Sequence, residues 1–553
     1  MDKGEENRVI ERWMLQLQTG QVTRRAFVRR MAMLGLSLPT ISWLLAACGV
    51  SPSGSPLASG SAAAGGPRAG GTLVINYLDE IPALEPHTSP ATASVRFFQL
   101  IYTTLLRFDK DLNPVPDLAE TWDVSEDGLT YTFMLRSNLK FSNGDPLTSE
   151  DVKFSFDRIL DPDVPAIGAS FYSEVDSVEA VDPSTVVFHM KNPAAAIPVY
   201  VAGTESVIIS KKVAEAGDLT KIENAIGSGP FKVDEWVPDS HMTLSRNPNF
   251  YEEGKPYIDG IRVNIVPNED AVLASFASNA TDFAVSLDGR FGKQAQGAGG
   301  LNVLSTEALG YYLFFNQTAV EPINNPKVRD ALNYALDREG IIQAASLGEG
   351  SPSGPIPPAN TLWAKPTSSW PQYTRDLDKA RQLLSDAGFA DGFSFKMLTQ
   401  TSDPVNAPTI AETVQAQWAE IGVTVEIELM EFSAWVQHWL DATFTIIPGN
   451  NSGAPDPDFY LYRYFHSTGN LQFVTGNFNT PELDAALDEG RTSSDFDTRK
   501  AAYDTAQDIL VEGAPFYWLY SGFIYSILSP RVKDYVPRAD ESIANLRDAW
   551  LSE

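Results

Sequence analysis

The sequence predicts a soluble body of mixed α/β fold. Runs of alternating and β-branched residues at 71–77, 129–135 and 185–190 are typical of strands, and apolar residues at helical spacing follow them. There is no repeat with a period of 20 to 50 residues and no heptad pattern, which argues against solenoids, propellers and coiled coils. The 553 residues are enough for three or four domains of ordinary size.

The composition excludes several classes of protein. Hydrophobic residues make up 43% and charged residues 20% of the chain, as in ordinary globular proteins. Asp and Glu number 71 against 41 Lys and Arg, so the net charge is -30. This charge repels nucleic acid and anionic lipid headgroups, and we expect no nucleic-acid partner. A single cysteine rules out an intramolecular disulfide and a multi-cysteine metal cluster.

The first 47 residues have the pattern of an export signal. Arg24 and Arg25 precede an apolar stretch at 31–47 that contains Pro and Gly and is too short and too polar for a permanent membrane anchor. The sequence around the paired arginines resembles a twin-arginine signal. Residues 45–49, which include Cys48, resemble the lipobox of bacterial lipoproteins. We therefore expect cleavage before Cys48 and a lipid on its thiol, with the alternative that Cys48 is an ordinary buried thiol.

Residues 48–70 consist almost only of Gly, Ser, Ala and Pro after the cysteine. Such a segment cannot form a core and is typical of a flexible tether. The sequence thus predicts a body held outside the cytoplasm, on the periplasmic or outer face of the membrane, by a lipid.

Within the body, several helices have clear start and stop signals. Thr148, with Asp151 three places later, forms an acidic variant of the capping box before a helix that runs to about residue 160. Pro326 follows Asn325 at the next predicted helix start, and further helices are expected at 376–386 and 480–490, where Gly388 and Gly490 mark the ends.

The common catalytic patterns are absent from the sequence. There is no G-x-S-x-G motif, and in the nearest string, at 449–453, the serine is one place too late. There is no phosphate-binding loop, and the histidines are not spaced for zinc. They are His87, His189, His241, His438 and His466. We expect neither an enzyme nor a metal site, although a secreted hydrolase with paired carboxylates stays open as an alternative.

Six ordered segments carry a resemblance that covers nearly the whole body. They are residues 139–156, 226–231, 246–251, 315–316, 325–338 and 378–389. Together they are similar to the bacterial solute-binding proteins of ABC importers in the dipeptide, oligopeptide and nickel family, family 5. The resemblance implies a periplasmic-binding-protein-like α/β fold of type II, cluster C-like, in which two lobes close as a clamp and an extra domain is inserted. It implies no cofactor.

The resemblance also implies how the chain is divided. The expected segments are the export signal 1–47, the tether 48–70, domain I at 71–100, domain II at 101–225, domain I again at 226–308, domain III at 309–512 and the last segment of domain I at 513–553.

The binding site is implied less sharply. Many peptide-binding members have an aspartate in domain III that pairs with the ligand's α-ammonium group. In the matching region, 444–460, this position falls on Asn450 or Gly453, and neither is an acid. Asp456 and Asp458 form a Pro-Asp-Pro-Asp turn. A peptide-like solute is the leading expectation, and an oligosaccharide or a nickel chelate are alternatives for the same fold.

The expected pocket residues come from three parts of the chain. They are His87, Ser89, Asn316, Gly449, Asn450, Asp456 and Tyr520. For a sugar ligand, Trp363, Trp435 or Trp518 could provide a stacking surface. The implied partners are the solute and the permease of the cognate ABC importer, and the family resemblance implies a monomer.

Overall fold

The computed structural model describes residues 66–78, 80–81, 83–89, 92–286, 288–316, 322–400, 406–451 and 455–552. Residues from Pro67 onward form one compact unit. The predictions for Arg24, Arg25 and Cys48, and for most of the tether, lie outside the described residues.

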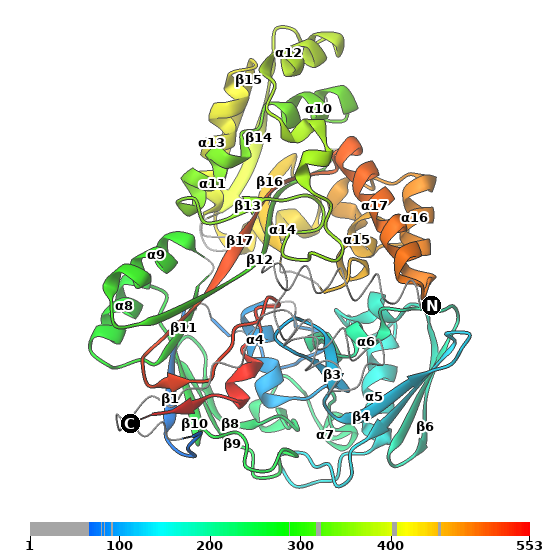
Figure 1. Cartoon of the computed structure of the whole chain (residues 1–553), viewed down its shortest axis with the longest axis vertical. Helices are drawn as coiled ribbons and strands as arrows, with labels where there is room; N and C mark the ends of the chain where they lie inside the picture. Colours follow the sequence, from blue (N-terminus) through cyan, green and yellow to red (C-terminus); the bar gives the residue numbers. More distant parts are fainter. Residues whose placement is uncertain are drawn as a thin grey trace, which may run out of the picture. The chain divides into compact units, whose positions relative to one another are not determined.

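An eleven-stranded sheet runs through this unit (Figure 1). Its order is β15-β14-β16-β12-β17-β11-β1-β10-β9-β8, and β13 pairs with β17. The strands are β1 (Thr72–Tyr77), β8 (Phe231–Val237), β9 (His241–Arg246), β10 (Gly260–Ile265), β11 (Phe283–Ser286), β12 (Asn302–Phe315), β13 (Ser351–Pro352), β14 (Phe393–Gln400), β15 (Val423–Met430), β16 (Ile446–Asn451) and β17 (Phe516–Leu528).

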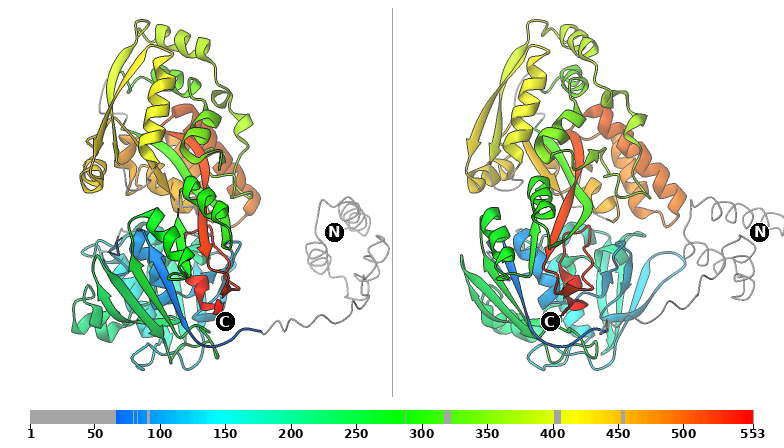
Figure 2. Two further views of the ribbon diagram at one scale, coloured as in Figure 1. Left: turned by 90° about the vertical axis from the view of Figure 1, so that its left-hand side faces the viewer. Right: turned by 60° about the vertical axis from the view of Figure 1, so that its left-hand side comes forward.

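The two long strands β12 and β17 join two parts of this sheet. One half of β17 pairs with β11 as well as with the start of β12, while the other half of β12 pairs with β16. Two register shifts interrupt the β12–β17 pairing, between Glu307 and Leu309 and between Tyr311 and Tyr312. Figure 2 shows both strands continuing from the part that holds β1 to the part that holds β14 and β15.

A second sheet has four strands in the order β4-β5-β7-β6. These strands are β4 (Ala119–Val124), β5 (Thr130–Leu135), β6 (Val175–Asp182) and β7 (Thr185–Met190). Short pairs are formed by β2 (Leu106–Phe108) with β3 (Pro114–Pro116) and by β18 (Val532–Lys533) with β19 (Trp550–Leu551). The strands predicted at 71–77, 129–135 and 185–190 are confirmed as β1, β5 and β7.

The helices cover the sheets, and the main ones follow the predicted signals. They are α4 (Thr92–Ile101), α5 (Ser149–Leu160), α6 (Ile197–Tyr200), α7 (Lys211–Ala216), α8 (Glu269–Ala277), α9 (Gly289–Ala298), α10 (Pro326–Tyr334), α11 (Arg338–Ser346), α12 (Leu377–Asp386), α13 (Ala407–Ala419), α14 (Phe432–Leu440), α15 (Asp458–Phe465), α16 (Pro481–Thr492) and α17 (Phe496–Gly513). The capping box at Thr148 is confirmed: Asp151 Oδ2 accepts from the Thr148 backbone N–H at 3.0 Å. None of the described helices has both the length and the apolar character needed to cross a bilayer.

The sheets and helices group into two lobes. The first lobe contains β1–β11, α4–α9 and the C-terminal segment, and the second contains β13–β16 and α10–α17. One apolar cluster, with Phe133, Phe156 and Tyr200, fills the space beside the four-stranded sheet. Another, with Phe465 and Tyr503, lies among α15, α16 and α17. The division into domains I, II and III by residue number stays a prediction.

Candidate functional site

Three neighbouring strands place polar and aromatic side chains in one line where the lobes join. Tyr311 on β12 pairs with Asn450 on β16 on one side and with Tyr520 on β17 on the other. Directly paired residues on adjacent strands extend to the same face of a sheet. The rings of Tyr311 and Tyr520 stack with their centroids 4.4 Å apart. We call Asn450, Tyr311 and Tyr520 the central row.

The hydroxyl of Tyr520 is held by two donors from the second lobe. Ser346 Oγ lies 3.0 Å away at the end of α11, and Asn406 Nδ2 donates from 2.9 Å just before α13. Burial raises the pKa of the Tyr520 phenol above its usual value, so the group stays neutral. The row therefore presents neutral hydrogen-bonding groups and aromatic faces.

Several buried polar atoms near the row have no hydrogen-bond partner among the described residues. They are Asn406 Oδ1, Thr399 Oγ1 on β14 and Ser521 Oγ on β17. Asn406 is only 1% exposed. Unsatisfied buried acceptors and donors of this kind cost free energy unless water or a ligand pairs with them. This neighbourhood can thus take a ligand that offers matching polar groups.

Charged side chains lie close to the same row on the first lobe. Arg290 at the start of α9 pairs with Asp288 at 2.8 Å, and both act electrostatically on Tyr520. The Arg290 side chain is nevertheless 44% exposed. Nearby, burial and the charge of Asp288 raise the pKa of Glu269 to about 7. The local charge beside the row therefore changes near neutral pH, and Arg290 supplies a fixed positive charge.

The two expected residues of the loop after β1 are both buried. His87 is buried, and its Nε2 lies 2.9 Å from the carbonyl oxygen of Val207. Burial lowers the pKa of His87 to about 4, so the ring is neutral at pH 7. Ser89 is also buried, and its Oγ has no partner in the described part of the chain. Within that part, no hydrogen bond or ring contact joins either residue to the central row.

The expected residues of domain III have different surroundings. Asn450 belongs to the central row, and Gly449 precedes it on β16, where an added Cβ would lie 2.2 Å from the Phe314 ring. Asn316 lies at the end of β12 and donates from Nδ2 to the carbonyl of Ala442 at 2.5 Å. These positions share one region of the sheet, so the structure brings Gly449, Asn450 and Tyr520 together.

Asp456 is fully engaged inside the second lobe. Arg499 Nη2 donates to its two carboxylate oxygens at 2.8 and 2.9 Å, and both side chains are buried. Burial raises the pKa of Asp456, whereas the charge of Arg499 lowers it. Because the guanidinium lies within hydrogen-bond distance of both oxygens, we expect the carboxylate to stay ionised and paired. Both oxygens are thus paired with Arg499 and buried, so we do not assign a ligand ammonium to Asp456.

Sequence reasoning missed Tyr311, Ser346 and Asn406. The only local signal was the pair Tyr311 and Tyr312 after Gly310, which is equally typical of a core strand.

The three tryptophans considered for a sugar ligand, Trp363, Trp435 and Trp518, are all less than 10% exposed and pack in the core of the second lobe. The described residues contain no group of three or more His, Cys, Asp or Glu side chains arranged to hold a metal ion.

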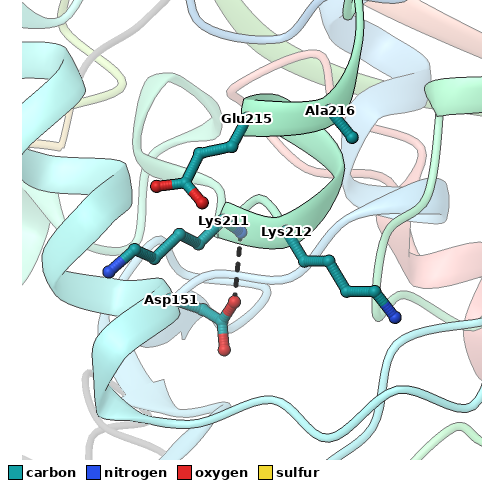
Figure 3. Close-up of a pocket in the computed structure, with 5 residues that line it drawn as sticks. All are labelled: Asp151, Lys211, Lys212, Glu215 and Ala216. Carbon is teal, nitrogen blue, oxygen red and sulfur yellow. Dashed lines mark hydrogen bonds between the residues drawn. The ribbon is translucent and has the colours of Figure 1, made fainter.

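An open pocket of about 380 Å³ lies elsewhere, at the start of α7 (Figure 3). Its lining residues are Asp151, Lys211, Lys212, Glu215 and Ala216. Asp151 already accepts from the Lys211 backbone N–H at 3.1 Å, and Lys212 pairs with Asp145 at 3.0 Å. None of the central row lines this pocket, so we do not assign the ligand to it.

Comparisons with known proteins find relatives that cover most of the chain. The model of the family described as "Bacterial extracellular solute-binding proteins, family 5 Middle" matches residues 113–472. The chain is 28% identical over 455 residues to the glutathione-binding protein GsiB of Salmonella typhimurium, covering 80% of this chain and 88% of that protein. It is 30% identical over 471 residues to heme-binding protein A of Haemophilus influenzae, covering 79% and 84%.

A solved structure shows the same architecture. The oligopeptide-binding protein AppA from Bacillus subtilis, in complex with a nonapeptide, aligns with a TM-score of 0.78 and 26% identity over 88% of this chain and 100% of that one. The fold expected from the sequence, an α/β clamp of the periplasmic-binding-protein type II, is therefore confirmed.

Proposed function

Because the chain belongs to the bacterial extracellular solute-binding proteins of family 5, we propose that it captures a peptide-like solute between its two lobes and delivers it to the permease of an ABC importer. Relatives named for glutathione and for oligopeptides support this solute class. The proposed activity is binding and release, without catalysis.

The central row carries this proposal. Asn450, Tyr311 and Tyr520 lie in register on three adjacent strands, and Asn406 Oδ1 beside them has no hydrogen-bond partner among the described residues. A ligand pocket that combines aromatic faces with a few well-placed polar groups is the usual arrangement for small-molecule recognition. Amide groups of a peptide can both donate to Asn406 Oδ1 and accept from the Asn450 side chain.

The charged side chains near the row and in the Pro-Asp-Pro-Asp turn restrict the chemical class of the solute further. Asp456 is paired with Arg499, and Asp458 with Arg491, so neither acid of the Pro-Asp-Pro-Asp turn is free to bind an α-ammonium group. Arg290, by contrast, is half exposed close to Tyr520. We therefore propose a solute with amide groups and at least one carboxylate, in which the carboxylate pairs with Arg290.

The test is a binding panel followed by calorimetry. Glutathione, a neutral tetrapeptide, heme, a nickel–histidine complex and a neutral oligosaccharide are each added to the protein during thermal unfolding. A solute at a hundred times its Kd stabilises the folded form by about 2.7 kcal/mol. We expect the largest shift with a peptide that carries a carboxylate. Flat melting curves for both peptides, or hydrolysis of a solute, contradict the proposal.

A pair of asparagine variants locates the site. Asn450→Ala should weaken binding of the best peptide at least tenfold, because one neutral, half-buried hydrogen-bonding group is lost at the row. Asn264→Ala is the matched control: Asn264 is also half-buried on a strand of the same sheet, but it bonds to Asn76 on β1. Equal effects of the two variants would mean that the row is not the site.

We also propose that the protein acts as a monomer at the outer face of the membrane, held by a lipid on Cys48, with the domain boundaries expected above. Cys48→Ser should abolish incorporation of labelled palmitate and release the exported protein from the membrane.

The proposed export route is tested separately. Arg24→Lys together with Arg25→Lys should stop export, and normal export of this double variant would exclude the twin-arginine route.

A further inference from the structure

The two lobes touch at a second place, away from the central row. Tyr200 ends α6 in the first lobe, and its hydroxyl donates to Asp458 at the start of α15 in the second lobe. These residues are 258 positions apart in the sequence. Tyr200 is 2% and Asp458 0% exposed, so the contact excludes water.

The acceptor is held in place from within its own lobe. Arg491 on α16 donates from Nε to both oxygens of Asp458 at 3.0 Å, and the Tyr503 hydroxyl lies 3.4 Å from Oδ1. Arg491 itself lies over the Tyr462 ring, 3.3 Å from its centroid. Asp458 therefore keeps its ion pair whether or not the first lobe is near, and only the bond from Tyr200 depends on the position of the lobes.

Other side chains make the same contact between lobes. Arg491 Nη1 donates to Ser173 Oγ in the first lobe at 3.0 Å. The ring of Phe459 on α15 stacks on Phe171, with centroids 4.3 Å apart, and packs with the apolar cluster of the first lobe. Arg463 lies 5.1 Å from the centre of the Phe171 ring. We call the contacts among Phe171, Ser173, Tyr200, Asp458, Phe459 and Arg491 the Tyr200 latch.

We propose that the Tyr200 latch holds the lobes closed independently of the solute, and that Tyr200 is a positioning residue for closure. This inference rests on the proposed clamp function. A hydrogen bond to a buried carboxylate is stronger than one between neutral groups, and it is lost completely when the lobes separate. The latch therefore raises the closed fraction of the solute-free protein and slows the release of a bound solute.

The latch does not include any residue of the central row. It can thus be altered without touching the groups proposed to bind the solute. Tyr200→Phe removes the hydroxyl but keeps the ring, which also stacks on Phe171 with centroids 5.0 Å apart. Tyr131→Phe is the matched control, because the buried Tyr131 hydroxyl donates at 2.9 Å to the Ala194 carbonyl within the first lobe.

The experiment measures the distance between the lobes without any solute. Cysteines for spin labels replace Lys110 in the first lobe and Asp378 in the second, in the full chain with Cys48→Ser. Their side chains are 62% and 98% exposed. We expect most molecules of the parent protein to show a short label separation. In Tyr200→Phe, the ratio of the population with the short separation to the population with the long separation should fall about tenfold. Tyr131→Phe should lower the melting temperature without changing the separations.

A second variant guards against a folding artefact. Ser173→Ala removes the acceptor of Arg491 Nη1, together with a long 3.5 Å hydrogen bond from Ser173 Oγ to the neighbouring Glu174. It should open the lobes in the same direction as Tyr200→Phe, by a smaller factor. Identical distance distributions in the parent and both latch variants would overturn the proposal, as would a parent protein that is always open. Neither result depends on a solute, so failure of the latch is distinct from failure of the binding panel.

Discussion

The ring of Tyr311 stacks on the ring of Tyr520, with 12° between their planes, at the point where β12 and β17 pass from one lobe to the other. Gly522, two places after Tyr520 on β17, has no side chain, and an added Cβ there would lie 2.7 Å from the Tyr311 ring. The stack is thus fixed by a small residue on the neighbouring strand, and it orients the phenol that Ser346 and Asn406 bind.

Tyr520→Phe should destabilise the protein as well as weaken solute binding. The change leaves the Ser346 hydroxyl and the Asn406 amide without their acceptor, which costs about 1–3 kcal/mol of unfolding free energy. Urea unfolding, with and without the best peptide, measures both effects. Tyr334→Phe is the control, since this half-buried hydroxyl forms no hydrogen bond with any described residue. Equal stability losses in the two variants would contradict the assigned role.

Gly449→Ala should be poorly tolerated. Its Cβ would stand 2.2 Å from the Phe314 ring, and overpacking of this kind costs about 1–3 kcal/mol. Gly297→Ala in α9 is the opposite case, because no atom of the described residues contacts its Cβ position within 4 Å, and it should stabilise the helix by about 0.5–1 kcal/mol. The two melting temperatures should therefore move in opposite directions, and a common direction would count against the packing argument.

Asp456→Asn should reveal a structural role for this carboxylate. The variant leaves Arg499 buried without its partner, and breaking a buried ion pair in this way costs about 3–5 kcal/mol. Asp157→Asn breaks the exposed pair with Lys153 and should change the unfolding free energy by less than about 1 kcal/mol. If Asp456→Asn kept its stability and lost only peptide affinity, Asp456 would be a ligand residue instead.

Glu269→Gln should alter the pH dependence of stability. Burial raises the pKa of Glu269 from 4.5 to about 7 in the folded protein, so the folded form binds more protons than the unfolded form between these values. The stability contribution is therefore present at low pH and is lost as the pH rises through 7. Between pH 5 and pH 8, the melting temperature should fall more steeply for the parent protein than for Glu269→Gln. Parallel plots of melting temperature against pH would contradict the raised pKa of Glu269.

Much of the architecture could be predicted because it is encoded locally. The Thr148 capping box, Pro326 after Asn325 and the alternating residues of β1 act over a few positions, and the structure has each of them. The six family-like segments likewise identified the scaffold. These signals depend on neighbours in the chain, which a single sequence displays directly.

The site was harder to predict because it is assembled from distant residues. Tyr311, Asn450 and Tyr520 meet only through strand register, and Asn406 joins them from a separate helix start. Asp456 shows the opposite difficulty, because the aspartate of a turn motif gave no hint of Arg499, which lies 43 residues later. Pairings of this kind are decided by three-dimensional packing, so composition and spacing cannot reveal them.

The position of β17 has a consequence for biosynthesis. Although it is the last long strand to be translated, it lies in the interior of the sheet, between β11 and β12. A nascent chain that has emerged only as far as residue 515 therefore exposes the unpaired edges of two strands, and such edges can pair with other chains. This route to aggregation is removed only when residues 516–528 leave the ribosome and β17 pairs with both β11 and β12.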